Sequence, residues 1–343
     1  MNDQSGKIEA PLFFRSVISS ISLAALLVSA SYGQSASGPC AGADGLFARG
    51  DTVVFLGDSN SYNGEYIVLL DAWWRRHRPG LDLQILNLAL PSETASGLSE
   101  PEHPFPRPNV HDRLQRVLQQ TRPDVVFVCY GINDGIYYPY SPERFAAFRQ
   151  GICDLSRRIR QSGARLVLMT PFPFDPLPLQ DSGRLRAVDS QAFAWNAPYQ
   201  DYDQVMQRYA RWIMSCTRQA DLLIDLHTPL TRFLDGHRQV NPGFTVSPDG
   251  VHFDRQGHAV FARSILSALE GPSTVDFEED YLEVIRRHQH LLRDAWLTHC
   301  GHDRPGMPAG MPLDRALRQA RAMEARIDQL AAPSARRPAS HGD

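Results

Sequence analysis

Near its start the chain carries an apolar run of strand length that stops at Gly-Asp-Ser: Asp51-Thr52-Val53-Val54-Phe55-Leu56-Gly57-Asp58-Ser59-Asn60. In residues 64–70, which follow, apolar side chains recur at helical spacing. A serine between a buried strand and a helix lies at the crevice of an open α/β sheet. Gly57 has no Cβ, so the backbone can turn sharply there and a ligand can approach closely. We therefore predict that Ser59 is a nucleophile within reach of a substrate.

Strand and helix patterns alternate along the rest of the chain. Runs of buried-strand character occupy residues 83–90, 125–130, 165–170 and 222–226, and helical patterns occupy residues 110–121, 141–162, 199–219 and 256–269. Two long irregular segments, residues 91–108 and 172–198, interrupt the alternation. Repeated strand–helix units predict an α/β fold with a parallel central sheet and helices on both faces.

Composition limits the classes of function. A chain of 343 residues can bury one large core, or a core with an appendage. Its 43% hydrophobic and 21% charged residues are ordinary for a globular protein. The net charge of -3 provides no basic footprint for nucleic acid or anionic lipid. We expect no nucleic-acid partner, and a substrate that is neutral or at least not strongly charged.

The amino-terminal segment has the pattern of a signal peptide, over residues 1–33. Lys7 and Arg15 flank a polar start, and residues 16–31 are apolar and small. Val28-Ser29-Ala30 fits a signal peptidase, and Gly33 offers a second cleavage point. The run is shorter than the roughly 20 residues that span a bilayer. We expect a secreted or periplasmic protein with no stable membrane insertion after cleavage; the alternative is an uncleaved amino-terminal anchor.

The cysteines add little. They are five, an odd number that cannot pair completely: Cys40, Cys129, Cys153, Cys216 and Cys300. Cys129 and Cys153 are expected to be packed thiols. Cys40 and Cys300 could bridge the two ends of the chain in an oxidising compartment, and the sequence leaves this open.

Residues 273–332 form a predicted carboxyl-terminal extension, with helical patterns over residues 277–296 and 313–330, and residues 333–343 are expected to be disordered. The histidines of this region are not spaced as a compact metal-ligand set, so we expect solvent-exposed side chains and no metal: His288, His290, His299 and His302. The extension could dock on the core, form a dimer contact or cover the pocket. The sequence does not choose between these roles, nor does it determine the oligomeric state.

A second motif directly follows the third strand: Gly131-Ile132-Asn133-Asp134. It falls at the same edge of the sheet as Ser59. There the amide of Asn133 can donate a hydrogen bond to a developing oxyanion. The alternative is an ordinary turn, because Gly, Asn and Asp dominate turns.

A third motif lies in a loop before the last core helix: Ser247-Pro248-Asp249-Gly250-Val251-His252-Phe253. The carboxylate of Asp249 can fold back onto the imidazole of His252, three residues later, and fix its tautomer. Such a histidine can take a proton from a serine hydroxyl and return it to a leaving group. Taken alone, the motif also fits a helix cap followed by a surface histidine, but the three motifs together place a nucleophile, an amide donor and an oriented base at one sheet edge.

These three motifs, in this order over residues 51–269, resemble the SGNH or GDSL-type esterases and lipases. The resemblance implies a flavodoxin-like, three-layer α/β/α hydrolase domain over residues 45–272, with no metal and no cofactor. It implies that Ser59 is the nucleophile, His252 the general base and Asp249 its partner. The remaining motif residues would support them: Gly57, Asp58, Gly131 and Asp134.

The family also implies three oxyanion-hole donors, namely the amide of Ser59, a glycine amide after the second strand, and the side chain of Asn133. The sequence departs from the family at the glycine, since Ser92 stands at the expected position after Asn87. Any residue except proline supplies a backbone N–H, although a Cβ narrows the pocket. Gly97 is the alternative donor if the loop is shifted.

The resulting prediction is a secreted serine esterase that forms an acyl-enzyme, acts on small-molecule or glycan esters, and removes acetyl groups from carbohydrate. Loop aromatics that could stack on sugar rings, or merely pack, are Phe105, Tyr137, Tyr138, Phe172, Phe174 and Trp195. Three alternatives stay open: an acyltransferase with the same triad, a non-catalytic glycan-binding module, and a metal-dependent phosphoesterase.

Overall fold

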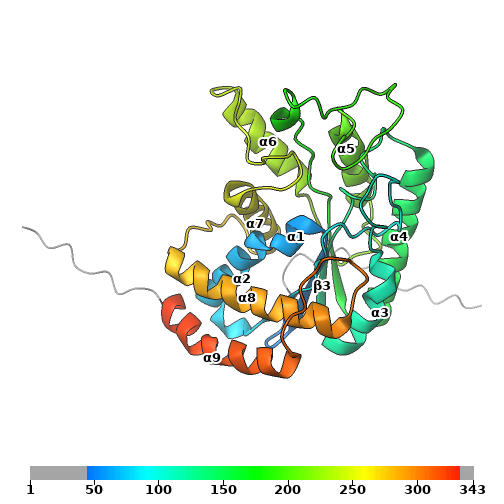
Figure 1. Ribbon diagram of the computed structural model, residues 1–343. Coiled ribbons are helices and arrows are strands. Elements are labelled where there is room, and N and C mark those ends of the chain that lie inside the picture. Colours follow the sequence, from blue (N-terminus) through cyan, green and yellow to red (C-terminus); the bar gives the residue numbers. More distant parts are fainter. Residues whose placement is uncertain (1–44, 333–343) are drawn as a thin grey trace, which may run out of the picture. The chain divides into compact units, whose positions relative to one another are not determined.

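The computed structural model describes residues 45–332 (Figure 1). Within them a parallel sheet has the strand order β2-β1-β3-β4-β5. Its strands are β1 (Thr52–Gly57), β2 (Gln84–Asn87), β3 (Val125–Cys129), β4 (Arg165–Met169) and β5 (Leu222–Ile224). This is the flavodoxin-like order, in which ligands bind outside the carboxyl ends of the neighbouring strands β1 and β3. The predicted three-layer α/β/α fold with a parallel sheet is confirmed.

The helices of the described range connect these strands and continue beyond the sheet. They are α1 (Ser59–Asn63), α2 (Glu65–His77), α3 (Val110–Thr121), α4 (Pro142–Gln161), α5 (Tyr202–Ile213), α6 (His227–Arg238), α7 (Arg255–Leu269), α8 (Glu279–Cys300) and α9 (Leu313–Ala331). Two short 3-10 turns occupy Pro79–Leu81 and Leu177–Leu179. Every helix of residues 45–332 is too short or too polar to cross a lipid bilayer.

Alternate residues of each strand enter two separate cores. Val53 and Phe55 of β1 pack with side chains of α2 and α7, whereas Val54 and Leu56 pack with side chains of α3, α4 and α5. A strand that is buried on both faces needs a continuous apolar run, because successive side chains point to opposite faces. This explains why residues 53–56 contain no polar side chain.

The predicted elements differ from the structure in a few places. The helical pattern over residues 199–219 yields only α5, and helix α6 was not predicted at all. Pro229 lies in the first turn of α6, where its missing N–H costs no hydrogen bond. The serine turn and the helix after it are separate helices, because Gly64 between them adopts a left-handed φ of 76°.

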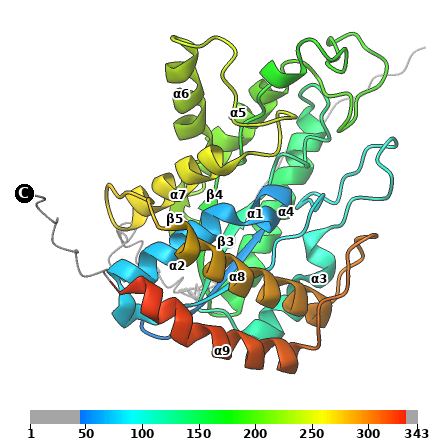
Figure 2. The ribbon, with the colours of Figure 1, turned by 60° about the vertical axis from the view of Figure 1, so that its left-hand side comes forward.

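The carboxyl-terminal extension is docked on the core (Figure 2), and α8 contacts the edge strand β2. The first half of α8 packs with α2, for example through Ile285, and its last residues pack with α3 in the other core, for example through Leu297. Arg116 of α3 donates to the carbonyl oxygen of Cys300 at 2.6 Å. Helix α9 packs in turn against α8. Exposed edge strands invite pairing with other chains, and here a helix covers the edge.

The expectation that the histidines of the extension are solvent-exposed is wrong for His288. Its side chain is buried between α8 and α9, and its Nε2 lies 3.0 Å from Glu324 Oε1. The pattern of a single helix did not reveal that α9 covers this face. His299 is exposed, and His290 and His302 are half-buried.

The thiol groups of Cys129, Cys216 and Cys300 are free and buried, and Cys153 is half-buried. Cys40, the predicted signal peptide over residues 1–33 and the predicted tail over residues 333–343 lie outside the described residues.

Candidate active site

The serine turn is held by close backbone packing. A Cβ on Gly57 would lie 2.5 Å from Ser61 Oγ and 2.8 Å from the carbonyl oxygen of Cys129, so only glycine fits there. Asp58 caps α1, because its Oδ1 accepts from the N–H of Asn60 at 3.1 Å. Ser59 is the first residue of α1, a position whose N–H has no partner within the helix. The turn therefore presents both the hydroxyl and the N–H of Ser59 at the sheet edge.

The loop between α6 and α7 brings Asp249 and His252 to this serine. Asp249 Oδ2 lies 2.7 Å from His252 Nδ1, and His252 Nε2 lies 2.9 Å from Ser59 Oγ. The other carboxylate oxygen of Asp249 accepts the N–H groups of Val251 at 3.0 Å and of His252 at 2.8 Å. One carboxylate thus holds both the loop backbone and the orientation of the imidazole ring. The His252 side chain is 54% exposed.

The charges of this group are coupled. The hydrogen bond to Asp249 raises the pKa of His252 above 6.5. Burial raises the pKa of Asp249, but the hydrogen bonds from His252 outweigh burial and hold it well below its usual range. Behind them, burial raises the pKa of Asp58 to about 7 and that of Asp134 to about 6. The carboxylate that faces the imidazole therefore stays ionised at neutral pH, and the two deeper carboxyls do so less completely.

Asn133 lies on the neighbouring strand end. Gly57 and Cys129 are paired in the β1–β3 register, which places the segment after β3 beside the serine turn. Asn133 Oδ1 accepts from Arg107 Nη1 at 2.9 Å and from the hydroxyl of Tyr137 at 3.3 Å. Asn133 Nδ2 donates to the carbonyl oxygen of Glu93 at 3.2 Å, which leaves its second N–H available for a ligand.

Ser92 lies on the opposite side of the serine turn. Backbone pairing continues past β2, since the N–H of Leu90 donates to the carbonyl oxygen of Gly57 at 2.9 Å. Ser92 follows in the turn closed by the N–H of Glu93, and its carbonyl oxygen lies 3.5 Å from Arg107 Nη1, the same nitrogen that donates to Asn133. Its φ of 67° is in the left-handed region that favours glycine. Within residues 45–332 its N–H has no hydrogen-bond partner, whereas the N–H of Gly97 donates to Thr94 Oγ1 at 3.2 Å.

A family model for the GDSL-like lipase/acylhydrolase family matches residues 55–260. The match covers more than half of the chain and includes Ser59, Ser92, Asn133, Asp249 and His252. The chain belongs to this family.

As a GDSL-like acylhydrolase, the chain is a carboxylic ester hydrolase, and both the resemblance and the predicted enzyme class are confirmed. One similar solved structure is a gut microbial diltiazem-metabolizing enzyme, with 20% sequence identity and a TM-score of 0.51 over 65% of this chain and 47% of that one. A second is LAE5, an alpha/beta hydrolase from the metagenome of Lake Arreo, Spain, with 20% identity and a TM-score of 0.46 over 67% of this chain and 99% of that one. A third is an acetylxylan esterase from Geobacillus stearothermophilus, with 18% identity and a TM-score of 0.48 over 65% of this chain and 96% of that one. The chain spans about half the length of the first of these. At this level of identity the likeness shows the fold alone. No curated protein matches the chain significantly in sequence.

Two features of this GDSL-like site could not be read from the sequence. The first is Asn60, whose Nδ2 donates to the carbonyl oxygen of Val251 at 2.9 Å and whose Oδ1 accepts the N–H of Phe253 at 3.2 Å. Its buried side chain ties the serine turn to the loop that carries His252. A single asparagine after the serine carries no local signal for a bond to residues 191 and 193 positions away.

The second is a buried ion pair behind Asn133. Arg107 donates from Nε and Nη2 to the two carboxylate oxygens of Glu100, at 2.6 Å each, and both side chains are almost fully enclosed. The pair fixes the guanidinium that holds Asn133 Oδ1, and so fixes which end of the amide faces the site. In the sequence both residues belong to a polar, proline-rich loop, and no spacing rule pairs them.

The loop aromatics that were predicted to stack on sugar rings or to pack differ in their burial. Phe172, Phe174 and Tyr137 are buried packing residues, whereas Trp195 is 43% exposed and Phe105 and Tyr138 are half-buried.

Asp134 holds the segment after Ser92, since its Oδ1 accepts from the N–H groups of Ala95 at 2.9 Å and Ser96 at 2.7 Å. Within residues 45–332, no group of three or more His, Cys, Asp or Glu side chains is placed to hold a metal ion.

Proposed function

We propose that this chain hydrolyses short acyl esters by two-step acyl transfer through Ser59. The observation that carries the proposal is the continuous hydrogen-bond chain from Ser59 Oγ to His252 Nε2, at 2.9 Å, and from His252 Nδ1 to Asp249 Oδ2, at 2.7 Å. A serine is activated when an adjacent base can take its proton and a third group orients that base. These three side chains meet both conditions.

The reaction follows from this geometry. His252 Nε2 takes the hydroxyl proton as Ser59 Oγ attacks the ester carbonyl carbon, and Asp249 stabilises the imidazolium that forms. The tetrahedral intermediate collapses, and the alcohol leaves with the proton from His252. Water then attacks the acyl-enzyme and gives a proton to His252, which returns it to Ser59 Oγ as the carboxylic acid departs. Because the His252 side chain is 54% exposed, water has direct access to this step.

Three donors would hold the oxyanion: the free N–H of Asn133 Nδ2, the N–H of Ser59 and the N–H of Ser92. Asn133 and Ser92 lie beside the serine turn through the β1–β3 register and the bond from Leu90 to Gly57. The occupied N–H of Gly97 makes it the weaker choice for the third donor. Each donor of this kind contributes on the order of 10²–10³ in rate.

For the substrate, we propose an acetyl ester on a carbohydrate. The Cβ of Ser92 takes space that glycine would leave open in the acyl pocket, which favours a small acyl group. Trp195 supports a sugar substrate, because it is 43% exposed while its backbone N–H donates at 3.3 Å to Oε1 of Glu100, the partner of Arg107. Exposed aromatic faces offer apolar area at the mouth of a polar site.

We also propose that the mature enzyme is exported. The support is the charged, apolar and small-residue pattern of residues 1–33. Cell fractionation followed by amino-terminal sequencing tests this: a mature chain starting near residue 31 or 34 in the medium or periplasm is expected, and full-length chain in the membrane fraction would indicate an anchor.

The decisive experiment compares wild type, Ser59→Ala and the exposed-surface control Ser267→Ala on 4-nitrophenyl acetate. Wild type and the control should hydrolyse it at equal rates, and Ser59→Ala should lose at least about 10⁴-fold. Equal rates in wild type and Ser59→Ala would refute the assignment. Inactive wild type that still binds acetylated oligosaccharides would indicate a binding module, and wild-type activity abolished by a chelator would favour the phosphoesterase alternative.

A further inference from the structure

The carboxyl-terminal extension places an arginine at the rim of this site. Arg304 lies in the loop between α8 and α9. Its Nε donates to the carbonyl oxygen of Pro91 at 2.9 Å, its Nη1 donates to the carbonyl oxygen of Pro305 at 3.0 Å, and its guanidinium lies 5.2 Å from the centre of the Phe105 ring. Pro91 directly precedes Ser92, so the guanidinium is attached to the backbone segment that would supply an oxyanion donor.

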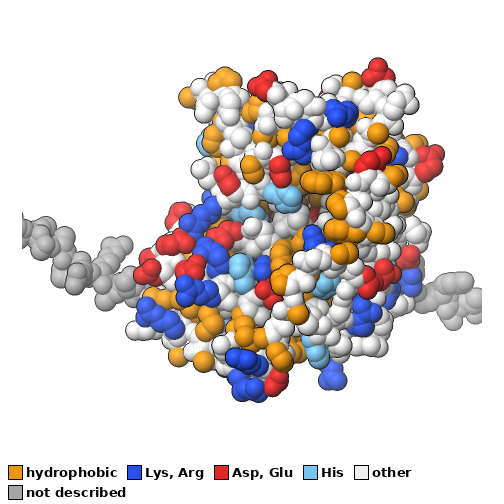
Figure 3. Space-filling model, viewed as in Figure 1, with side chains coloured by type: hydrophobic (Ala, Val, Ile, Leu, Met, Phe, Trp, Pro, Cys, Tyr) orange, Lys and Arg blue, Asp and Glu red, His pale blue; other side chains and the backbone are white. Residues whose placement is uncertain are grey.

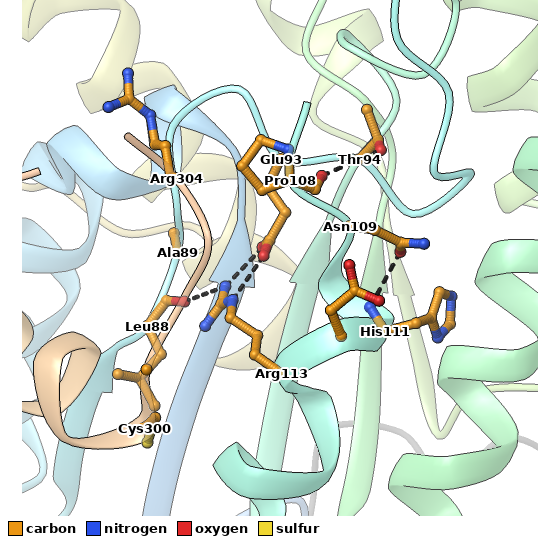
Figure 4. A network of polar contacts seen from close by, with 12 residues as sticks. Leu88, Ala89, Glu93, Thr94, Pro108, Asn109, His111, Arg113, Cys300 and Arg304 are labelled. Carbon is orange, nitrogen blue, oxygen red and sulfur yellow. Dashed lines mark hydrogen bonds and ion pairs between the residues drawn. The ribbon is translucent and has the colours of Figure 1, made fainter. Parts of the chain in front are cut away.

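Arg304 differs from Arg107, Arg113 and Arg293 in having no carboxylate partner among residues 45–332. Arg107 is paired with Glu100, Arg113 with Glu93 at 2.6 Å, and Arg293 with Asp294 at 2.8 Å. Figure 4 shows the contrast: the guanidinium of Arg113 points toward Glu93, whereas that of Arg304 points away from this pair. Arg304 is half-buried, and burial lowers the pKa of its guanidinium, because no anion offsets the lost hydration.

A second donor lies on the serine turn. Tyr62 is on α1, three residues after Ser59, a spacing that places the two side chains on one face of the helix. The Tyr62 ring is held by Arg293, whose guanidinium carbon is 3.9 Å from the ring centre. Within the described range the Tyr62 hydroxyl has no hydrogen-bond partner. Within residues 45–332, Arg304 Nη2 and the Tyr62 hydroxyl therefore have no protein hydrogen-bond partner, and both can bind a ligand.

We propose that Arg304 and the Tyr62 hydroxyl bind an anionic group of the substrate whose ester is cleaved at Ser59, which makes the substrate an acylated sugar with a nearby carboxylate or sulfate. The inference rests on the proposed function. A guanidinium with a free Nη2 and a phenolic O–H match the acceptor oxygens of such a group. The extension thus sets substrate selectivity without taking part in acyl transfer.

This proposal replaces the expectation of a neutral substrate that we drew from net charge. Basic and acidic side chains are interspersed over the face of the molecule in Figure 3. A net charge of -3 sums these contributions and carries no information on one unpaired guanidinium. Recognition of a single anionic group depends on that local charge and not on the sum.

The test uses three acetylated oligosaccharides that differ only in the sugar next to the acetylated residue, which is neutral, a uronic acid, or sulfated. Hydrolysis is measured for wild type, Arg304→Met, Arg304→Lys, Tyr62→Phe and the control Arg321→Met, which removes an exposed arginine from α9. We expect Arg304→Met to raise KM for the preferred anionic substrate about tenfold with kcat unchanged, because a half-exposed charge-assisted contact is lost. Arg304→Lys should retain part of the preference, Tyr62→Phe should raise KM about threefold, and Arg321→Met should match wild type.

The outcomes separate the two proposals. If wild type hydrolyses all three substrates equally, or if Arg304→Met slows the neutral and anionic substrates by the same factor, Arg304 only supports the loop and this inference is wrong. If wild type hydrolyses neither these substrates nor 4-nitrophenyl acetate, the proposed function fails. A preference for the uronic acid or for the sulfated sugar identifies which anion the pair binds.

Discussion

The family core and the carboxyl-terminal extension each contain a charge network around one glutamate, and the two networks differ in burial. In the core, Glu100 and Arg107 are almost fully enclosed, and Arg107 continues to Asn133 Oδ1 at 2.9 Å. In the extension, Glu324 of α9 bonds to Arg75 of α2 at 2.7 Å and to His288 of α8 at 3.0 Å, but its side chain is 37% exposed. Water screens the second network and not the first.

The difference teaches what each region does. A buried, bidentate pair costs desolvation and returns little stability, but it holds a side chain in one orientation. A partly exposed network adjusts easily and mainly adds stability. We therefore expect changes in the core network to alter the chemical step and changes in the extension network to alter only unfolding.

The largest effect on the core side is expected at Asp249. Asp249→Asn should lower kcat about 10⁴-fold, because the imidazole loses the group that fixes its tautomer. It should also move the acid limb of the pH–rate profile. The limb exists because protonated His252 cannot accept a proton, and Asp249 raises the pKa of His252 above 6.5, so loss of Asp249 should shift the limb to lower pH.

The measurement is kcat/KM for 4-nitrophenyl acetate as a function of pH. Asp254→Asn is the control, because Asp254 caps α7 two residues after His252 without touching the imidazole. It should leave the position of the limb unchanged. An unshifted limb in Asp249→Asn would show that the limb belongs to a different group.

A smaller catalytic effect is expected from the buried pair. The double variant Arg107→Met, Glu100→Gln avoids leaving one charge buried alone and releases Asn133 Oδ1. We expect kcat to fall about 10²-fold with little change in KM, as for loss of one oxyanion donor. Affinity for a boronic acid, which mimics the tetrahedral intermediate, should fall by a similar factor.

The matched control is the double variant Glu93→Gln, Arg113→Met, which removes a second buried pair between the loop after β2 and helix α3. That pair is equally enclosed but makes no side-chain contact with Asn133. If kcat falls in both double variants in proportion to their loss of stability, Arg107 acts only on folding and not on the oxyanion donor.

The fold and the three motifs were predictable because their signals are local. Residues 53–56 form a strand buried on both faces, and this shows as four consecutive apolar side chains. Asp249 and His252 lie three residues apart in one loop, so their contact needs no knowledge of the rest of the chain. The sequence also showed that Ser92 stands where the family has a glycine, and in the structure Ser92 adopts the left-handed φ of 67° that favours glycine.

What could not be predicted depends on partners that are distant along the chain or on packing between elements. Asn60 bonds to a loop almost 200 residues later, and Arg304 reaches Pro91 from a region outside the family match. His288 is buried only because α9 folds over α8. Patterns within one helix or strand carry no information on such contacts.

The smallest effect is expected from the extension network and tests the other half of the comparison. In the folded protein burial raises the pKa of Glu324, but its bonds to His288 and Arg75 outweigh burial and lower the pKa from 4.5 to about 2. The carboxylate therefore adds stability that is present above pH 4.5 and is lost as the pH falls toward 2. Because the side chain is 37% exposed, screening by water limits this contribution to about 1 kcal/mol.

Glu324→Gln should lower Tm by about 2–4 °C at pH 7 and progressively less below pH 4.5, with kcat/KM unchanged. Asp314→Asn, in a fully exposed pair with Arg318 on the same helix, should change neither quantity. A loss of activity in Glu324→Gln at a temperature where the variant is folded would show that the extension network reaches the catalytic residues, and that the division between the two regions is wrong.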